Sequence, residues 1–188
     1  VRVLPGEGAF YGPKIGFDFR DVLERSWPLA TVQIDCAMPE RFGLKYVTSD
    51  GTEAPPVMLH RAVLGSIERF IAILLEHCAG AFPLWLAPVQ LKVLTVTDEH
   101  KEYAGKIVDQ LRVGGWRVEF DGRNEKLGYK IREAQLAKIP YAVIIGDKEV
   151  AAESVAPRRR GGENVAPLPV AQFVKNLHAE VAQEMGEA

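Results

Sequence analysis

The sequence predicts an α+β segment, made of strands and one helix, followed by an α/β segment with a mainly parallel sheet. The first observation is a change in the order of the predicted elements, from isolated strands and one helix to a regular alternation of strands and helices. Strands that alternate with helices imply crossover connections and parallel strands. The second observation is the pair Pro83 and Pro88, which separates the two segments. We therefore expect two domains, 1–87 and 88–188.

The first segment contains two predicted strands and one predicted helix. Thr31–Asp35 alternates with period two, so its three polar side chains share one face of a strand. Val57–Val63 is the second strand. A helix is expected over Ile67–His77, because apolar residues recur there at helical spacing and Ser66 can cap the N-terminus.

The second segment alternates strands with helices. Acidic residues in the opening turn of its first helix suit the helix dipole, and Gly114-Gly115 provides a C-terminal stop. A last amphipathic helix follows Pro169, with Phe173, Leu177 and Val181 on one face. The other expected elements are, in order, Val89–Thr97 (strand), Asp98–Val113 (helix), Trp116–Phe120 (strand), Lys126–Lys138 (helix) and Tyr141–Gly146 (strand).

Composition excludes several classes of protein. The longest apolar run, Phe70–Leu75, is far shorter than the roughly 18 residues that indicate a membrane span, so no membrane association is expected. Cys36 and Cys78 have no paired spacing, which favours a reducing cytoplasmic location over a disulfide framework or a thiolate metal site. The net charge of -2 argues against binding nucleic acid by bulk electrostatics. The chain enters strand-like sequence directly at Val1, so we expect a piece of a longer protein.

His60 and Arg69 are the first candidates for chemistry, and each has two interpretations. A single histidine in an apolar strand is usually a hydrogen-bonded structural residue, and a metal site needs three or four ligands. The other histidines and the cysteines form no recognisable ligand set with His60. Arg69 stands in the first turn of a helix, where a cation is mildly unfavourable. Either a bound phosphate or the neighbouring Glu68 could compensate it.

Basic residues of the second segment could contact RNA. Tyr129 and Arg132 share a helix face, so a base could stack on one and bind to the other. Residues 121–160 hold nine Lys/Arg against six Asp/Glu, a local balance of +3. A solvated charged surface explains the helix equally well, and Arg158 to Gly162 could be an exposed hairpin turn.

Together these residues resemble the C-terminal part of a bacterial-type threonyl-tRNA synthetase, over essentially the whole chain. Such a resemblance implies that 1–87 is the closing part of a class II catalytic domain, with an antiparallel sheet, and that 88–188 is an anticodon-binding domain. Several long motifs in the family's order carry it: FYGPK (10–14), TVQID (31–35), PVMLHRAVLGSIERF (56–70), PLWLAPVQ (83–90), RNEKLGYKIREAQLAKIPY (123–141) and GDKEV (146–150).

The resemblance also implies roles for residues of the first segment. His60 matches a histidine that ligates a catalytic Zn²⁺, whose other two ligands would precede Val1. Arg69 matches the arginine of the third class II motif, which clamps the triphosphate of Mg²⁺-bound ATP. Lys14 is expected to take part in catalysis. Tyr11, Thr31 and Gln33 match positions around the amino-acid pocket.

For the second segment, the resemblance implies contacts with anticodon bases of tRNA by Asn124, Arg132, Glu149 and Arg158. The complete protein is expected to be a cytoplasmic homodimer that attaches threonine to tRNA with ATP. This chain alone is expected to be inactive, because the first two class II motifs are missing.

Two departures from the family pattern keep alternatives open. Pro28-Leu29-Ala30 stands where Gln-Cys-Gly is usual, and Gly16 stands where an aspartate is usual. Since that glutamine helps to hold the adenosine, ATP affinity is in question. The alternatives are a non-catalytic RNA-binding paralogue or another class II synthetase, of the proline, glycine or histidine type.

Overall fold

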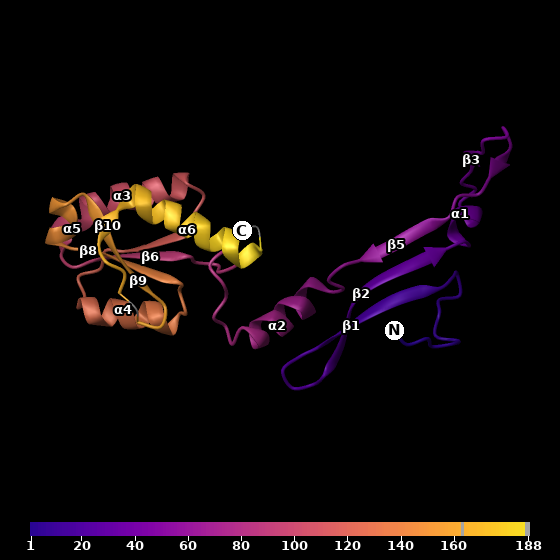
Figure 1. Cartoon of the computed structure of the whole chain (residues 1–188), viewed down its shortest axis with the longest axis horizontal. Helices are drawn as coiled ribbons and strands as arrows, with labels where there is room; N and C mark the ends of the chain where they lie inside the picture. The colour runs from indigo at the N-terminus through magenta and orange to yellow at the C-terminus, as the bar shows by residue number, and fades with distance from the viewer. Residues whose placement is uncertain (163, 187–188) are drawn as a thin grey trace. The chain divides into compact units, whose positions relative to one another are not determined.

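The computed structural model describes residues 1–162 and 164–186, and its contacts divide the chain into two units, Val1–His77 and the residues from Cys78 onward. Figure 1 shows the order of the elements in each unit. The division falls before residue 87, and the domain limit between 87 and 88 stays a prediction. Residues 163, 187 and 188 of the expected second domain lie outside the described part.

The first unit contains a three-stranded antiparallel sheet in the order β1-β2-β5. The predicted strands at Thr31–Asp35 and Val57–Val63 and the predicted helix at Ile67–His77 are confirmed, whereas β1 was not predicted. Its elements are β1 (Lys14–Arg20), β2 (Ser26–Asp35), α1 (Met38–Arg41), β3 (Tyr46–Val47), β4 (Glu53–Ala54), β5 (Met58–Ala62) and α2 (Ile67–His77).

Asp21 fixes the connection between β1 and β2. Its buried carboxylate accepts the backbone N–H groups of Leu23 and Arg25, each at 2.9 Å, and the indole N–H of Trp27 at 2.9 Å. Burial alone would raise the pKa of Asp21, but these donors and the Arg25 guanidinium lower it well below its usual range. The aspartate is therefore ionised and orders the hairpin loop.

A β-bulge interrupts β2 at the Pro28-Leu29 step. Phe17 pairs with Ala30, but the next residue, Asp18, pairs with Pro28, so Leu29 is the extra residue. Proline cannot donate to a ladder, and within sheets it is found mainly at edges and bulges. The shift has a further effect, because it brings Pro28 into register with Asp18 and thus onto the same face of the sheet as Lys14 and Gly16.

The second unit is a five-stranded sheet in the order β10-β9-β8-β6-β7. β6 is parallel to β7 and to β8, while β9 and β10 add to the β8 edge antiparallel, so the predicted mainly parallel sheet is confirmed. Its elements are β6 (Leu91–Thr95), η1 (Asp98–His100), α3 (Lys101–Val113), β7 (Val118–Asp121), α4 (Leu127–Leu136), β8 (Tyr141–Ile145), α5 (Asp147–Ala151), β9 (Ser154–Arg159), β10 (Leu168–Pro169) and α6 (Val170–Met185).

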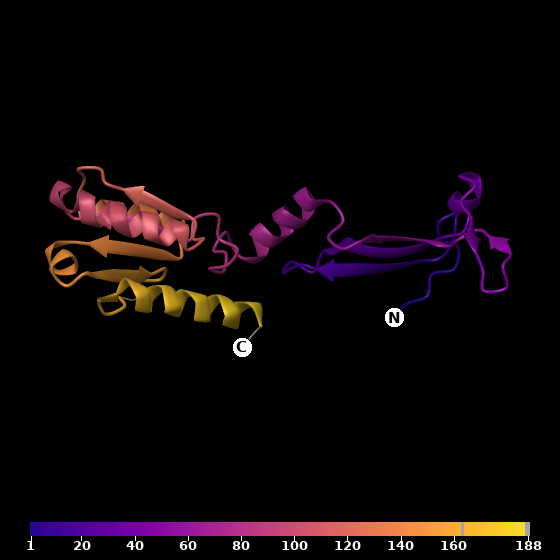
Figure 2. The ribbon, with the colours of Figure 1, turned by 90° about the horizontal axis from the view of Figure 1, so that it is seen from above.

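Helices cover both faces of this sheet. On one face α3 packs toward β6 and β7 and α6 toward β9 and β10, while α4 covers the other face (Figures 1 and 2). The larger core cluster includes Leu91, Val143 and Phe173, and a smaller cluster beneath α4 includes Leu94 and Ala134. All the helices expected here are confirmed, and α5, β9 and β10 are additions to the prediction.

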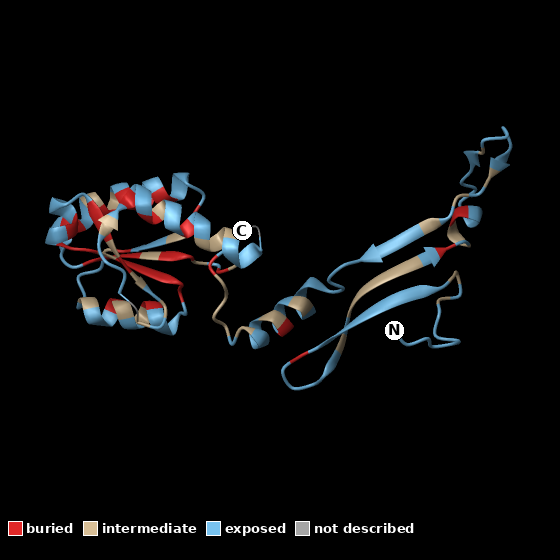
Figure 3. Cartoon of the chain, viewed as in Figure 1, coloured by how far each residue is buried: buried red, intermediate tan, exposed pale blue. Residues whose placement is uncertain are grey.

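Burial differs between the units, as Figure 3 shows. In the second unit most residues of the central strands β6 and β8 are buried, whereas in the described first unit Ile73 is the one buried large apolar residue. The face of β1 that bears Ile15, Phe17 and Phe19 leaves these side chains 62%, 55% and 42% exposed. No helix among the described residues is long and apolar enough to cross a membrane.

Candidate functional site

Five of the residues predicted from the sequence gather on one face of the β1-β2-β5 sheet. Gln33 of β2 pairs in register with Lys14 of β1 on one side and with His60 of β5 on the other. Directly opposed residues of antiparallel strands share a face, and Thr31 lies on it two residues before Gln33. The hydroxyl of Tyr11 donates to Gln33 Oε1, and Gln33 Nε2 donates to Thr31 Oγ1 at 3.2 Å. The amide is thus held in one orientation, pointing along this face.

Gly12 makes the turn that brings Tyr11 to this face. It has φ +157°, and a Cβ atom built there would lie 2.2 Å from the carbonyl oxygen of Ile34. The backbone on either side is tied to β2 and its end, because Ile34 N–H donates to Pro13 O at 3.0 Å and Cys36 N–H donates to Tyr11 O at 3.1 Å. Only glycine fits this close approach.

His60 is bound to a buried aspartate. Its Nε2 lies 2.9 Å from Oδ2 of Asp35, whose side chain is 1% exposed, while the imidazole is 46% exposed. Burial would raise the pKa of Asp35, but the N–H of Met38, the imidazole and the N–H of Ala37 lower it. An ionised Asp35 accepts a hydrogen bond from the Nε2–H group of His60, which leaves Nδ1 as the free acceptor. Histidine ligands of metals commonly have such a carboxylate partner.

The described residues do not complete a metal site. No group of three or more His, Cys, Asp or Glu side chains within 1–162 and 164–186 could hold a metal ion. The donor chemistry of His60 fits one ligand position of a zinc site.

Arg69 stands in the first turn of α2, as predicted. Ser66 Oγ accepts the N–H of Arg69 at 3.4 Å and donates to Glu68 at 2.7 Å, which lowers the pKa of Glu68. Glu68 is therefore occupied by Ser66, and Arg69 is exposed and takes part in no ion pair with the described residues. The preceding Gly65 has φ +62°, and a Cβ there would lie 2.7 Å from the carbonyl of Leu29.

The four predicted RNA-contacting residues occupy different elements of the second unit. Asn124 lies exposed in the loop after β7, and Glu149 lies in the first turn of α5 directly after β8. Both therefore follow the carboxyl ends of parallel strands, where ligands of such sheets commonly bind. Arg132 is exposed on α4, and Arg158 belongs to β9, paired with Ala142.

Two of these residues have structural features that the sequence did not indicate. Glu149 is buried, and its Oε2 accepts the N–H of Gly146 at 3.0 Å, so it caps the helix in which it lies. Arg158 and Arg159 are strand residues, and the turn predicted for them begins only at Arg160. The Nε of Arg158 is buried and has no hydrogen-bond partner within the described part of the chain.

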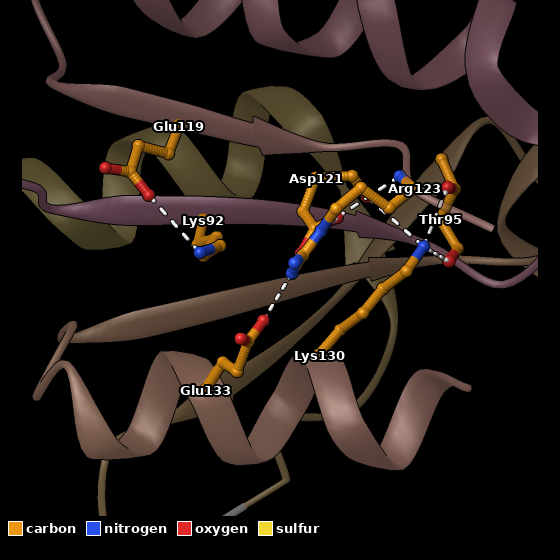
Figure 4. Close-up of polar contacts among 7 residues, drawn as sticks. All are labelled: Lys92, Thr95, Glu119, Asp121, Arg123, Lys130 and Glu133. Carbon is orange, nitrogen blue, oxygen red and sulfur yellow. Dashed lines mark hydrogen bonds and ion pairs between the residues drawn. The ribbon is translucent and has the colours of Figure 1, made fainter. Parts of the chain in front are cut away.

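A network of charged residues, which no sequence pattern predicted, includes Arg123, the residue before Asn124. Figure 4 shows the side chains of this network. Arg123 binds Asp121 with two nitrogens, Nε to Oδ1 at 2.9 Å and Nη2 to Oδ2 at 2.6 Å, and its Nη2 also pairs with Glu133 of α4. Lys130 of the same helix is 1% exposed, and its Nζ donates to the carbonyl oxygens of Thr95 at 2.9 Å and Asp121 at 3.4 Å.

An open groove of about 720 Å³ runs along β7 next to this network. The acidic groups that line it are paired with cations: besides Arg123 with its two carboxylates, Lys92 lies 3.3 Å from Glu119, its register partner on β7. Its lining residues are Lys92, Arg112, Val118, Glu119, Phe120, Asp121, Arg123, Glu133, Leu136 and Ala137.

Comparison with known families matches both units. Residues 1–78 match the tRNA synthetase class II core domain (G, H, P, S and T), and residues 89–180 match the anticodon binding domain. The chain is 55% identical, over 99% of its length, to the threonine–tRNA ligase of Clostridium tetani, and 55% identical over 100% to that of Symbiobacterium thermophilum. The chain belongs to the threonyl-tRNA synthetase family. It corresponds to the end of the class II core together with the anticodon-binding domain.

A solved threonyl-tRNA synthetase structure has the same fold. The RNA binding domain of threonyl-tRNA synthetase from Cryptosporidium parvum Iowa II superimposes with a TM-score of 0.87 at 37% identity, over 93% of this chain and 44% of that one. This chain spans 29% of the length of both curated ligases. The matches that establish the family and the fold extend over nearly the whole chain. The ligase activity named for the relatives belongs to proteins of which this chain spans 29%.

Proposed function

We propose that this chain supplies the amino-acid pocket face, the third class II motif and the anticodon recognition of a threonine–tRNA ligase, in which ATP activates threonine and tRNA accepts the threonyl group. The observation that carries the proposal is the row Lys14, Gln33 and His60 across three strands, with Tyr11 bound to Gln33. The relatives named as threonine–tRNA ligases support it. The complete protein is inferred to be a cytoplasmic homodimer.

The chain's residues contribute positioning and charge. Tyr11 and Thr31 hold the amide of Gln33 toward a ligand on the sheet face, and Asp35 holds the imidazole of His60 in one tautomer. Arg69, without an ion pair in the described chain, is available to a polyphosphate at the start of α2. A zinc ion, when bound, supplies a Lewis acid that can take an amino and a hydroxyl group together.

Replacing His60 in the complete protein is expected to reduce its zinc content. Because Asp35 leaves Nδ1 of His60 free to ligate, His60→Ala removes one donor and should lower zinc per subunit to a small fraction of the parent's, measured by elemental analysis after dialysis. The exposed His77, at the end of α2, provides a matched control, and His77→Ala should retain the parent's zinc. Equal zinc in both variants would remove His60 from the ligand set.

Neutralising Arg132 is expected to weaken RNA binding by this chain. Arg132 is exposed on α4, and loss of a guanidinium that contacts a base or phosphate costs about 1–3 kcal/mol, so Kd for a threonine-tRNA anticodon stem-loop should rise roughly tenfold in Arg132→Gln. Fluorescence anisotropy of the labelled RNA measures it. Lys175→Gln removes the same charge from an exposed position on α6 and should leave Kd unchanged. A similar loss in both variants would mean non-specific electrostatic binding.

The β-bulge at Pro28 gives a reason to test one alternative function, that of a non-catalytic RNA-binding protein. Pro28 lies by register on the face that bears Lys14, and it has no N–H to offer a nucleotide. A non-catalytic RNA-binding relative of the synthetases would bind the stem-loop yet activate no amino acid. Pyrophosphate exchange by the complete protein separates the two, since threonine-dependent exchange supports the ligase and its absence supports the RNA-binding protein.

A further inference from the structure

Arg123 connects three parts of the second unit around the loop that carries Asn124. Its backbone N–H and its side chain both bind Asp121, the last residue of β7, and the same guanidinium reaches Glu133 on α4. Arg123 thereby ties the loop of residues 122–126 to the end of β7 and to α4, and Figure 4 shows these contacts. Asn124 is the next residue of this loop.

The charges in this connection are set firmly in their ionised forms. The side chain of Asp121 is 3% exposed and that of Glu133 33%, while Arg123 is 51% exposed. The Arg123 hydrogen bonds lower the pKa of Asp121 despite its burial, and they also lower the pKa of Glu133. A guanidinium bound by two nitrogens to one carboxylate has a fixed plane, which a single contact would not give.

Lys130 of α4 binds the backbone at the start of the same loop. Its ammonium binds the carbonyls at the ends of β6 and β7, so the base of the loop cannot shift relative to α4. Glu133 lies four residues after Tyr129 on α4, so the two share a helix face, and Glu133 raises the pKa of the half-exposed Tyr129. Through Arg123, the same carboxylate is connected to the loop.

The groove beside the network does not itself present a binding site for a small charged ligand. Each of the acidic groups that line it, Asp121, Glu119 and Glu133, already has a cationic partner in the described chain, and Arg112 donates to Val118 O at 3.2 Å. A ligand would have to displace these pairs. Their arrangement fits a structural connection better.

We propose that Arg123 and Glu133 are positioning residues for RNA recognition: their ion pair holds the Asn124 loop at a fixed distance from the Tyr129 and Arg132 face of α4. This inference rests on the proposed anticodon function. Two separate elements must meet neighbouring bases of one RNA loop, and their preorganisation lowers the ordering cost of binding. Neither Arg123 nor Glu133 needs to touch RNA for this effect.

The test compares two carboxylates of the same groove. Glu133→Gln breaks the connection, and Glu119→Gln removes an equal charge from the Lys92 pair, which does not involve the loop. For the whole chain we expect Glu133→Gln to weaken anticodon stem-loop binding roughly tenfold, and Glu119→Gln to leave Kd within about twofold of the parent. Losing a negative charge should by itself strengthen RNA binding, so weaker binding would be opposite to the electrostatic effect.

Two further readouts distinguish positioning from a general loss of fold. Glu133→Gln should reduce the ratio of Kd values between stem-loops that differ in one anticodon base, while the salt dependence, which counts phosphate contacts, stays at the parent's value. Arg123→Gln and Glu133→Gln should act as one unit, so the double variant should bind no more weakly than the weaker single variant. Additive losses, or an unchanged base preference, would overturn the inference.

A further comparison, with Asn124→Ala, distinguishes failure of this inference from failure of the proposed anticodon function. If the parent chain and Asn124→Ala bind the stem-loop equally poorly, the anticodon function fails. If the parent binds and Asn124→Ala weakens it roughly tenfold while Glu133→Gln matches the parent, the function stands and the positioning role is wrong. A thermal midpoint for Glu133→Gln equal to that of Glu119→Gln confirms that folding is not responsible.

Discussion

Lys130→Met is expected to lower the free energy of unfolding of the second unit by about 3 kcal/mol. Methionine can follow the path of the lysine stem, so little volume is lost, but it cannot donate to the carbonyls of Thr95 and Asp121. Each buried acceptor left without a donor costs about 1–3 kcal/mol. Asp121 also loses a nearby cation in a position that is 4% exposed.

Hydrogen exchange resolved by peptide is the measurement for Lys130→Met, because it reports each unit separately. Amides of β6 and β8 should exchange faster by roughly two orders of magnitude if they open globally, as about 3 kcal/mol implies. Lys175→Met, at an exposed position of α6, makes the same chemical change without burial and should leave exchange unchanged. Unaltered protection of β6 in Lys130→Met would show that its ammonium contributes no net stability.

Gly12→Ala is expected to disrupt the face that holds Gln33 and His60. The added Cβ would lie 2.2 Å from the carbonyl of Ile34, and φ +157° is a conformation that residues with a Cβ rarely adopt. Overpacking alone costs about 1–3 kcal/mol, and the backbone strain adds to it. We expect a loss of roughly 3 kcal/mol or more, with Tyr11 displaced from Gln33.

Gly16 supplies the control for this second result. It lies in β1 on the same face and has no positive φ, and a Cβ atom added there would meet no neighbouring heavy atom within 4 Å. Gly16→Ala should therefore keep the exchange protection of β2 and β5, whereas Gly12→Ala should lose it. Equal protection in the two variants would mean that the turn adapts to a side chain and that Gly12 is not required by geometry.

Strong periodicity predicted most of the fold. The helix over Ile67–His77 and the strand–helix alternation after residue 88 follow directly from apolar spacing. β1 was not predicted, although Ile15, Phe17 and Phe19 recur at every second position as in a strand. The structure leaves these three side chains exposed. β9 contains Pro157, which argues against a strand in sequence, yet this strand lies between β8 and the very short β10.

The candidate sites were less accessible from sequence than the fold. Resemblance to the family indicated His60, but the contact with Asp35 depends on cross-strand geometry that one strand's sequence does not contain. Arg123 and Glu133 are ten residues apart and meet only because the loop turns back on α4. A lysine at an inward helix position, such as Lys130 beside Ile131 and Ala134, was the one local signal of a buried polar network.

The last helix of the second unit returns to the segment where that unit starts. Glu184 of α6 accepts the backbone N–H groups of Leu84 at 3.2 Å and Trp85 at 3.3 Å. Both ends of the fold are thus held side by side by one carboxylate. Neighbouring termini are the geometric requirement for circular permutation. A short linker could join them, with new ends opened at the exposed Gly114-Gly115 turn, without crossing the sheet.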